Sequence, residues 1–262
     1  MKNKILFLGS NQSDWQNISA TNPIDEISLT LNDTPDLLIK FVNKHKGKFI
    51  AGYISYEFGA IRLGVPVHDL NGIPAAHFYA FETFQKIEET VETPVANWSA
   101  FRPVISRKDY DTNFKKIKDH IRDGDFYQLN YTHLLESKTG APPESLFHTL
   151  RHKNNAGYSA FMEGEGWAIH SLSPEQFVKI ENEIIFTKPI KGTIPRENND
   201  TNDEFNLKKL LNSEKEQAEL YMIIDLLRND LGKVCETGSV EVIESKSIQK
   251  RVVLRIFLLR LY

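Results

Sequence analysis

Two carboxylates lie on the most clearly predicted helix of the chain, which runs from Ser213 to about Leu231. Ser213 and Glu216 form the S-x-x-E capping box that is typical of a helix start. At about 100° per residue, Glu216 and Glu219 fall within the apolar stripe that should face the core. The stripe is predicted to consist of Leu220, Ile223, Leu226 and Leu227. Carboxylates in such a position must be paired, protonated or bound to a metal.

Magnesium is the metal that this arrangement favours, because Mg²⁺ takes one or two protein carboxylates together with water and substrate oxygens. A simpler interpretation stays open. Glu216 would then only serve the capping box, and Glu219 would pair with a lysine or reach the solvent. Structural ion pairs also place charge at the edge of an apolar stripe, so the residues alone favour this simpler interpretation.

A lysine with possible chemistry lies in the strand-like segment 184–191, where Lys191 shares a face with Ile185, Thr187 and Pro189. A lysine in a partly apolar site can lose its proton and act as a nucleophile or a base. The next residue, Gly192, lets backbone N–H groups approach an anion, and Thr193 adds a hydroxyl donor. Taken alone, the pattern favours a solvated lysine at a strand end, because lysine is rarely buried.

A further carboxylate, Glu175, follows Ser173 and Pro174 at the end of the preceding strand-like segment. By itself this is a proline turn with an exposed acid. His148 and His152 have helical i, i+4 spacing, but the glutamate of an HExxH zinc motif is absent between them. A helix surface is therefore favoured over a metal site for the two histidines.

Helices and strands alternate along the chain, with no internal repeat. Apolar spacing predicts helices over 35–46, from Asp109 to Gly124, over 143–152, and over the Ser213 segment. Aromatic and β-branched residues predict strands over 49–58, 75–84 and 126–136, and an antiparallel meander over 158–191 with a tight turn at 181–183. This order favours an α+β fold with helices packed on a mostly antiparallel sheet.

The composition of the 262 residues is that of an ordinary globular protein, with 40% hydrophobic and 26% charged residues. A net charge of −3 argues against nucleic acid as a partner, because the sequence has no surplus of basic residues to bind phosphates. The single cysteine, Cys235, excludes an internal disulfide and fits a reducing compartment. With no apolar run long enough to span a membrane or form a signal peptide, we expect a cytoplasmic protein without membrane association.

Four segments in the same order resemble the chorismate-utilising enzymes, a family that includes anthranilate synthase component I, aminodeoxychorismate synthase component I, and isochorismate and salicylate synthases. The segments are DGDFYQLNYT (123–132), SLSPEQF (171–177), TKPIKGTIPR (187–196) and SEKEQAELYMIIDLLRNDLGKV (213–234). GYISYEFG (52–59) is similar to the N-terminal part of the aminodeoxychorismate branch. The resemblance implies an α/β sandwich of mostly antiparallel sheets with outer helices.

The resemblance also implies roles for the candidate residues. Glu175 matches a general acid/base, and Lys191 matches the nucleophile of the aminodeoxychorismate branch, where anthranilate synthases usually have alanine. Gly192 and Thr193 match a pair that contacts a substrate carboxylate. Glu219 matches a magnesium ligand, and Glu216 a neighbouring acidic position near the metal.

The activity implied by these matches is the amination of chorismate to 4-amino-4-deoxychorismate, a transferase reaction of folate (para-aminobenzoate) biosynthesis. Ammonia would come from a separate glutamine amidotransferase subunit, because no glutaminase nucleophile motif is present in the chain. Two alternatives stay open. The chain is an anthranilate synthase component I, or it is a truncated remnant of the family without catalytic activity.

The C-terminal end departs from the family pattern. Family members continue past residues 238–242 with a GGSITGAPK-like segment and a second magnesium glutamate, and neither is found here. We therefore predict an N-terminal region (1–100), an incomplete catalytic region (101–250) and an atypical tail (251–262). The tail, RVVLRIFLLRLY, has neither a helix nor a strand period. We interpret it as out of frame, and the alternative is a genuine tail of this lineage.

Overall fold

The computed structural model describes residues 3–10, 13–88, 96–154, 156–195, 197, 199–250 and 254–261. The chain divides into two compact units. Unit 1 comprises Met1–Glu89 and Asn154–Tyr262, and unit 2 comprises Thr90–Lys153. All six predicted site residues belong to unit 1. The segment 123–132, which also carries the family resemblance, belongs to unit 2.

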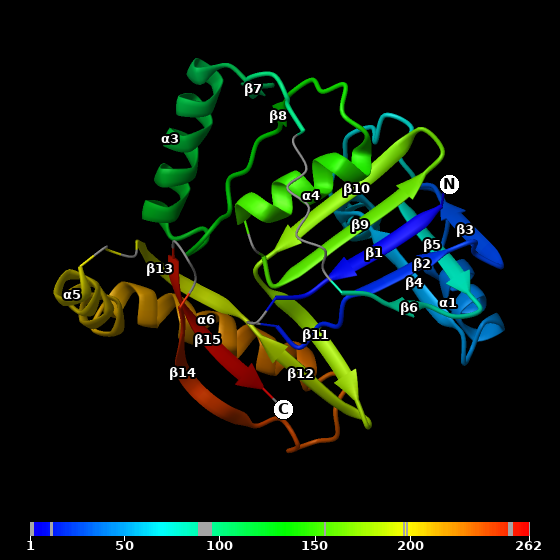
Figure 1. Ribbon diagram of the computed structural model, residues 1–262. Helices are drawn as coiled ribbons and strands as arrows, with labels where there is room; N and C mark the ends of the chain where they lie inside the picture. Colours follow the sequence, from blue (N-terminus) through cyan, green and yellow to red (C-terminus); the bar gives the residue numbers. More distant parts are fainter. Residues whose placement is uncertain are drawn as a thin grey trace. The chain divides into compact units, whose positions relative to one another are not determined.

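Unit 1 contains a sandwich of two antiparallel sheets (Figure 1). One sheet has the order β10-β9-β1-β2-β6 and the other the order β3-β5-β4. The strands of the first are β1 (Lys4–Leu8), β2 (Ile18–Thr21), β6 (Gln85–Lys86), β9 (Tyr158–Gly164) and β10 (Trp167–Ser173). Those of the second are β3 (Asp25–Leu29), β4 (Phe49–Ile54) and β5 (Ala76–Phe81). The apolar N-terminal run 5–8 is thus a buried strand.

The two sheets enclose one apolar core. Ile5 and Met162 from the first sheet pack with Ala51, Tyr79 and Phe81 from the second. Residues of β5 alternate between this core and the opposite face, where Ala76 packs with Phe58. That opposite face is covered by α1 (Pro35–Lys44) and by α2 (Tyr56–Ala60), which η1 (Ile61–Leu63) extends. The predicted sandwich with outer helices is therefore confirmed.

A buried histidine lies in the middle of this sandwich. The Nδ1 atom of His77 is 2.7 Å from the Ser28 hydroxyl, and its ring makes an edge-on contact with Trp167. Burial lowers the pKa of His77 to about 4, so the ring is neutral near pH 7. Its Nε2 lies 3.8 Å from a Glu26 carboxylate oxygen, which is too far for a hydrogen bond.

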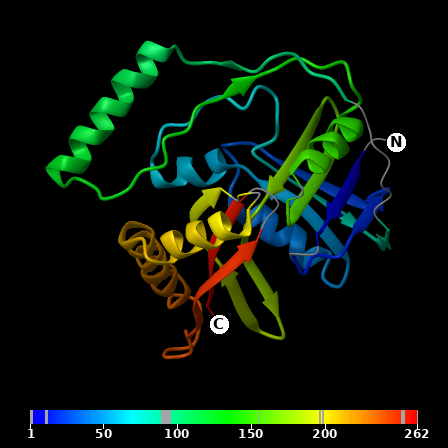
Figure 2. The same ribbon diagram turned by 60° about the vertical axis from the view of Figure 1, so that its left-hand side comes forward.

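A separate sheet in unit 1 carries the predicted lysine. It is formed by β11 (Gln176–Glu181), β12 (Ile184–Lys188), β13 (Ile190–Pro195), β14 (Val242–Lys250) and β15 (Leu254–Leu261). β15 pairs with β14, and also with β12 and β13. Thr187 pairs with Leu261 and Ile190 with Leu258, so β12 and β13 continue in one register across Pro189. Figures 1 and 2 show the β11–β12 hairpin and the neighbouring red β15.

Two helices belong to the same part of unit 1, namely α5 (Asp200–Leu211) and α6 (Glu214–Leu231). Leu210 of α5 and Leu220 and Ile224 of α6 form a core with Ile185 and Ile194 of the sheet. In Figure 1, α6 runs behind β13 and β15. None of the helices in the described parts of the chain is both long and apolar enough to cross a membrane.

Unit 2 consists mainly of helices α3 (Arg107–Asp123) and α4 (Pro143–Asn154), the latter ending at the unit boundary. Two short strands, β7 (Arg102–Pro103) and β8 (Leu135–Glu136), pair with each other. Helix α3 ends at Gly124, whose φ of +83° gives the left-handed cap that a glycine adopts without strain. The helices predicted from Asp109 and over 143–152 are confirmed.

Several strand predictions were wrong. Residues 126–134 contain no strand, and only Leu135–Glu136 is extended and paired. The predicted strand 49–58 ends at Ile54, because Ser55 caps α2. The predicted meander 158–191 is two hairpins in two different sheets, with Ser173–Pro174–Glu175 at the passage between them. Aromatic and β-branched residues predict an extended backbone, but the choice of partner strand is made elsewhere in the chain.

The tail also differs from its predicted pattern. Residues 254–261 form β15, although RIFLLRL lacks an apolar–polar alternation. Backbone hydrogen bonds to β14 on one edge and to β12 and β13 on the other form this strand without requiring side-chain alternation. Residues 251–253 and 262 of the tail lie outside the described residues. The boundaries predicted at residues 100 and 250 stay a prediction.

Candidate functional site

Glu175 is held against the strand that carries Lys191. The backbone N–H of Ile190 donates a hydrogen bond of 3.1 Å to the Glu175 Oε1 atom. This N–H faces β11 beyond the last pair of the hairpin, Gln176 with Lys188. The carboxylate therefore takes the place of a backbone acceptor at the point where Pro189 interrupts the ladder. Two segments fifteen residues apart are thus joined at the residue before Lys191.

The turn that carries Glu175 is closed by Ser173. The Ser173 hydroxyl donates to the Glu175 carbonyl oxygen at 2.8 Å and accepts from the Glu175 N–H at 3.1 Å. Such local hydroxyl bonds are typical of turns that hold the backbone in one geometry. The sequence interpretation did not single out Ser173 as a functional residue, although a serine two positions before an acid in a proline turn is a recognisable signal.

Lys191 lies on the face of the sheet that packs against α6. The register places Ile185, Thr187 and Lys191 on one face. A bulge between Lys191 and Thr193 then returns Ile194 to the same face. Since Ile185 and Ile194 pack on the α6 core, the half-buried Lys191 side chain starts from the same face. The predicted alternation of 185, 187, 189 and 191 agrees with this register.

Gly192 supplies the bulge beside the lysine. Its φ of +73° lies in the left-handed region, which a glycine enters at little cost. Gly192 is buried, whereas Thr193 is exposed on the opposite face of the strand. The bulge therefore directs the Lys191 and Thr193 side chains to opposite faces of the sheet, although they are only two residues apart.

The two carboxylates of α6 are half-buried. The exposed fractions of the Glu216 and Glu219 side chains are 23% and 29%. The Ser213 hydroxyl accepts the Glu216 N–H at 3.4 Å, so the predicted cap is present. The buried stripe is rotated from the prediction. Ile224 is buried, while Leu226 is exposed, because the helix packs through its 220, 224, 227 and 231 positions.

Both carboxylates share one cation. The Lys215 Nζ atom lies 3.8 Å from Glu216 Oε1 and 3.7 Å from Glu219 Oε1. The ion pair with lysine, which the sequence left open as the simpler interpretation of Glu219, is therefore present. Neither carboxylate forms an ion pair with Lys191 among the described residues. The Lys–Glu spacing of four residues from Lys215 to Glu219 was a readable signal for this pair.

The carboxylates fit a magnesium ion by their chemistry. Two half-buried carboxylates with a single ammonium carry a net negative charge, and oxygen is the donor that Mg²⁺ prefers. Within the described residues, no group of three or more His, Cys, Asp or Glu side chains could hold a metal. Any ion bound here would therefore take its other ligands from water and substrate oxygens, as Mg²⁺ often does.

The outer face of the β11–β12 hairpin carries a separate polar cluster. Lys179 pairs with Asp14 at 3.1 Å and with Glu181 at 3.0 Å. Burial, the largest single influence, acts to raise the pKa of Asp14, but the hydrogen bond from Lys179, a backbone hydrogen bond and the charges of Lys188 and Lys179 together lower it. Hydrogen bonds to Glu181 and then Asp14 raise the pKa of Lys179. These charges are on the face opposite to Lys191 and tie the hairpin to the β1–β2 loop.

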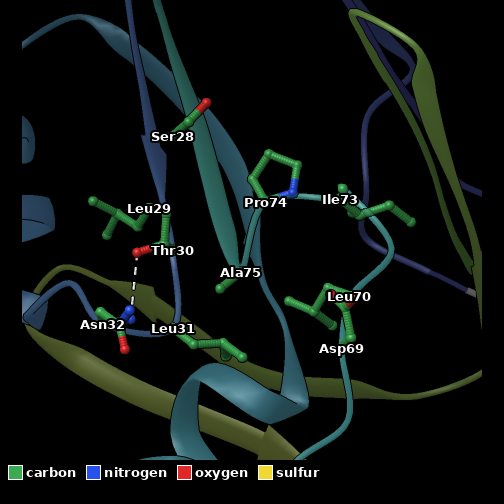
Figure 3. Close-up of a pocket in the computed structure, with 11 residues that line it drawn as sticks. Ser28, Leu29, Thr30, Leu31, Asn32, Asp69, Leu70, Ile73, Pro74 and Ala75 are labelled. Carbon is green, nitrogen blue, oxygen red and sulfur yellow. Dashed lines mark hydrogen bonds between the residues drawn. The ribbon is translucent and has the colours of Figure 1, made fainter.

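A cavity of about 420 Å³ lies away from these residues, at the edge of the β3-β5-β4 sheet (Figure 3). Its lining is mainly apolar, with the Thr30 hydroxyl bonded to the Asn32 N–H at 3.3 Å. The residues that line it are Ser28, Leu29, Thr30, Leu31, Asn32, Asp69, Leu70, Gly72, Ile73, Pro74 and Ala75. None of the six predicted site residues is among them, so this cavity and the candidate site are separate.

Comparison with known proteins identifies the family. Residues 86–254 match the chorismate binding enzyme family, and the chain therefore belongs to it. Aminodeoxychorismate synthase component 1 of Salmonella typhimurium is 40% identical over 152 residues, which are 58% of this chain and 34% of the relative. Anthranilate synthase component 1 3 of Haloarcula marismortui is 37% identical over 155 residues, 59% of this chain and 31% of the relative.

The fold agrees with this assignment. Anthranilate synthase component I from Streptococcus pneumoniae superposes with a TM-score of 0.75 at 21% identity, covering 99% of this chain and 68% of that structure. The family resemblance and the fold class predicted from the sequence are confirmed. The chain spans about a third of the length of each of these two curated relatives.

Proposed function

We propose that this chain carries the nucleophile and the acid/base of a chorismate-aminating enzyme of the aminodeoxychorismate synthase component I type. The observation that carries the proposal is the 3.1 Å hydrogen bond from the Ile190 N–H to Glu175, which places the carboxylate beside the strand of Lys191. The 40% identity to an aminodeoxychorismate synthase component 1 supports the choice of reaction.

The two residues have complementary tasks in this reaction. The unprotonated Lys191 amine attacks ring C2 of chorismate while Glu175 gives its proton to the departing C4 hydroxyl, which leaves as water. Ammonia then adds at C4 while the C2–nitrogen bond breaks and returns the neutral lysine amine; the new C4 ammonium gives one proton back to the Glu175 carboxylate, and 4-amino-4-deoxychorismate is released. Ile185 and Ile194 lie on the same sheet face as Lys191 and pack on the α6 core.

Substrate positioning is assigned to the neighbouring groups. Gly192 and Thr193 would offer backbone N–H donors at the bulge to one chorismate carboxylate, because the Thr193 side chain starts from the face opposite to Lys191. Glu216 and Glu219 would hold Mg²⁺, and the bound ion would neutralise a second carboxylate. Ammonia would be supplied by a glutamine amidotransferase subunit. Folate biosynthesis is the pathway that this product serves in the proposal.

The test is product formation from chorismate, ammonium and Mg²⁺, followed by mass spectrometry. Removal of the nucleophile or the acid should each reduce the rate by at least about 100-fold, so Lys191→Ala and Glu175→Gln are the informative variants. Lys188→Ala is the matched control. Lys188 is in β12, which continues in register into β13, and its side chain starts from the face opposite to Lys191. This variant should keep a rate within about threefold of wild type.

The products separate the alternatives. Rapid denaturation during turnover should trap a mass increase of chorismate less water on the peptide with Lys191, and not in Lys191→Ala. Unchanged 4-amino-4-deoxychorismate formation in Lys191→Ala contradicts the nucleophile assignment. Anthranilate as the main product would support the anthranilate synthase alternative, which the 37% identity to such an enzyme also favours. No product of either kind would contradict catalysis by this chain.

A further inference from the structure

Lys215 is placed between the two carboxylates that the proposed function assigns to magnesium. Its Nζ atom lies within 4 Å of one oxygen of each carboxylate, at 3.8 Å from Glu216 and 3.7 Å from Glu219. The lysine side chain is 77% exposed, whereas the two carboxylates are mostly covered. The cation is thus on the solvent side of an acidic pair that is itself held in the fold.

Two like charges on neighbouring positions of one helix face repel each other, and a cation between them relieves this repulsion. A lysine ammonium is a compact charge on a flexible stem that can move into solvent at little cost when it is exposed. A divalent ion bound by both carboxylates would occupy the region that the ammonium now neutralises. The two cations would therefore compete for the same pair of acids.

We propose that Lys215 is an internal counter-ion that holds Glu216 and Glu219 together without metal and gives way when Mg²⁺ binds. Lys215 then lowers the affinity for the metal while keeping the two acids arranged to receive it. This inference rests on the metal site of the proposed function and adds a residue that sets its affinity.

The experiment measures Mg²⁺ binding to the full chain by titration calorimetry, with Mn²⁺ paramagnetic resonance as a second readout. Lys215→Met removes the charge and keeps the stem. Exposed ion pairs are individually weak, so losing both should tighten metal binding by about three- to tenfold, which corresponds to about 0.7–1.4 kcal/mol. Lys215→Arg should stay close to wild type. The increase in metal affinity of Lys215→Met over wild type should be smaller at high salt, because screening weakens the attraction between the Lys215 ammonium and the carboxylates.

Lys208→Met is the matched control. Lys208 is also an exposed helix lysine in an i, i+4 pair, with Glu204 at 3.1 Å on α5, and its loss removes the same net charge. The Lys208 variant should leave the affinity within about twofold of wild type. A comparable gain in both variants would mean that overall charge alone acts, which overturns the counter-ion assignment.

A further variant separates this inference from the metal site itself. Glu219→Gln should weaken metal binding strongly if the carboxylates are ligands. If binding depends on Glu219 but is unchanged or weaker in Lys215→Met, the counter-ion proposal is wrong and the metal site stands. If binding is absent from every variant, or does not respond to Glu219→Gln, the metal site assigned in the proposed function is wrong and the counter-ion proposal fails with it.

Discussion

Helices α6 and α3 have similar apolar spacing but very different surroundings. In α6, Leu220 and Ile224 are 1% and 7% exposed, and they pack against the β12–β13 part of the sheet. In α3, no residue is buried in the described part of the chain, and Phe114 of its apolar stripe is 48% exposed. An amphipathic sequence therefore predicts the helix correctly in both cases and its burial in only one.

The stabilising interactions of α3 are local. The Ser106 hydroxyl accepts the Asp109 N–H at its start, and Arg107 pairs with Asp111 one turn later. Tyr110 stacks on Phe114 and on Tyr131. Apart from the stack on Tyr131, these contacts lie within α3 and its N-cap, whereas α6 packs against a sheet and α5. The difference between the two helices shows that capping and spacing form a helix, while another surface must be present to bury it.

The largest expected difference is in the response to apolar truncation. Leu220→Ala should lower the free energy of unfolding by about 2–5 kcal/mol, because it leaves a cavity in the α6 core. Phe114→Ala in α3 should change it by less than about 1 kcal/mol. Denaturant unfolding monitored by circular dichroism measures both. Equal effects would mean that the α3 stripe is covered in solution.

An intermediate effect is expected from acid on the sandwich core of unit 1. The folded-state pKa of His77 is about 4, below the ordinary value of 6.5, so the unfolded chain binds more protons between these pH values. The free energy of unfolding is therefore highest above about pH 6.5 and falls as the pH drops towards 4, by about 3 kcal/mol from this residue. His77→Phe should flatten the profile in this window.

The control for this profile is His152→Gln. His152 is an exposed histidine of unit 2, and its replacement should leave the slope unchanged. Urea unfolding at several pH values between 4 and 7.5 provides the measurement. A slope that persists in His77→Phe would assign the acid sensitivity to other groups and not to the buried histidine.

The smallest effect concerns the two N-caps. Ser106→Ala removes a hydroxyl cap and should destabilise α3 by about 1 kcal/mol, which raises amide exchange throughout its first turns. Ser213→Ala removes the corresponding bond of 3.4 Å in α6. Because packing holds α6, exchange there should change only at the first turn. Hydrogen exchange with mass spectrometry compares the two variants. If exchange rises over the same number of turns in both helices, the conclusion that α3 depends mainly on its own local contacts is wrong.

Some parts of the molecule were readable from short stretches of sequence. Ser213 predicted the start of α6, and Gly124 predicted the end of α3, each within one or two residues. The turn predicted at 181–183 is also present, and Asn182 and Glu183 both have positive φ there, as a type I′ hairpin turn requires. These features depend on the conformations of a few neighbouring residues.

Other parts depended on distant segments. The aromatic stretch 126–134 has strand composition but is not paired, and 254–261 lacks a strand pattern but is paired on both edges. The candidate site shows the same division. Its residue types were chosen from sequence, but the Ile190–Glu175 bond and the role of Lys215 as a shared cation required coordinates.

The sequence alone determined helices α1, α3, α4 and α6, the tight turn at 181–183, the family and the residues that could perform chemistry, because these follow from local backbone preferences and from motifs of a few residues; it did not predict α2 or α5. Only the tertiary structure decided that the 158–191 strands separate into two sheets with Glu175 between them, and that α6 packs through Ile224 rather than Leu226. Strand pairing and helix rotation are set by burial of apolar surface between segments far apart in the chain, and no local pattern contains that information.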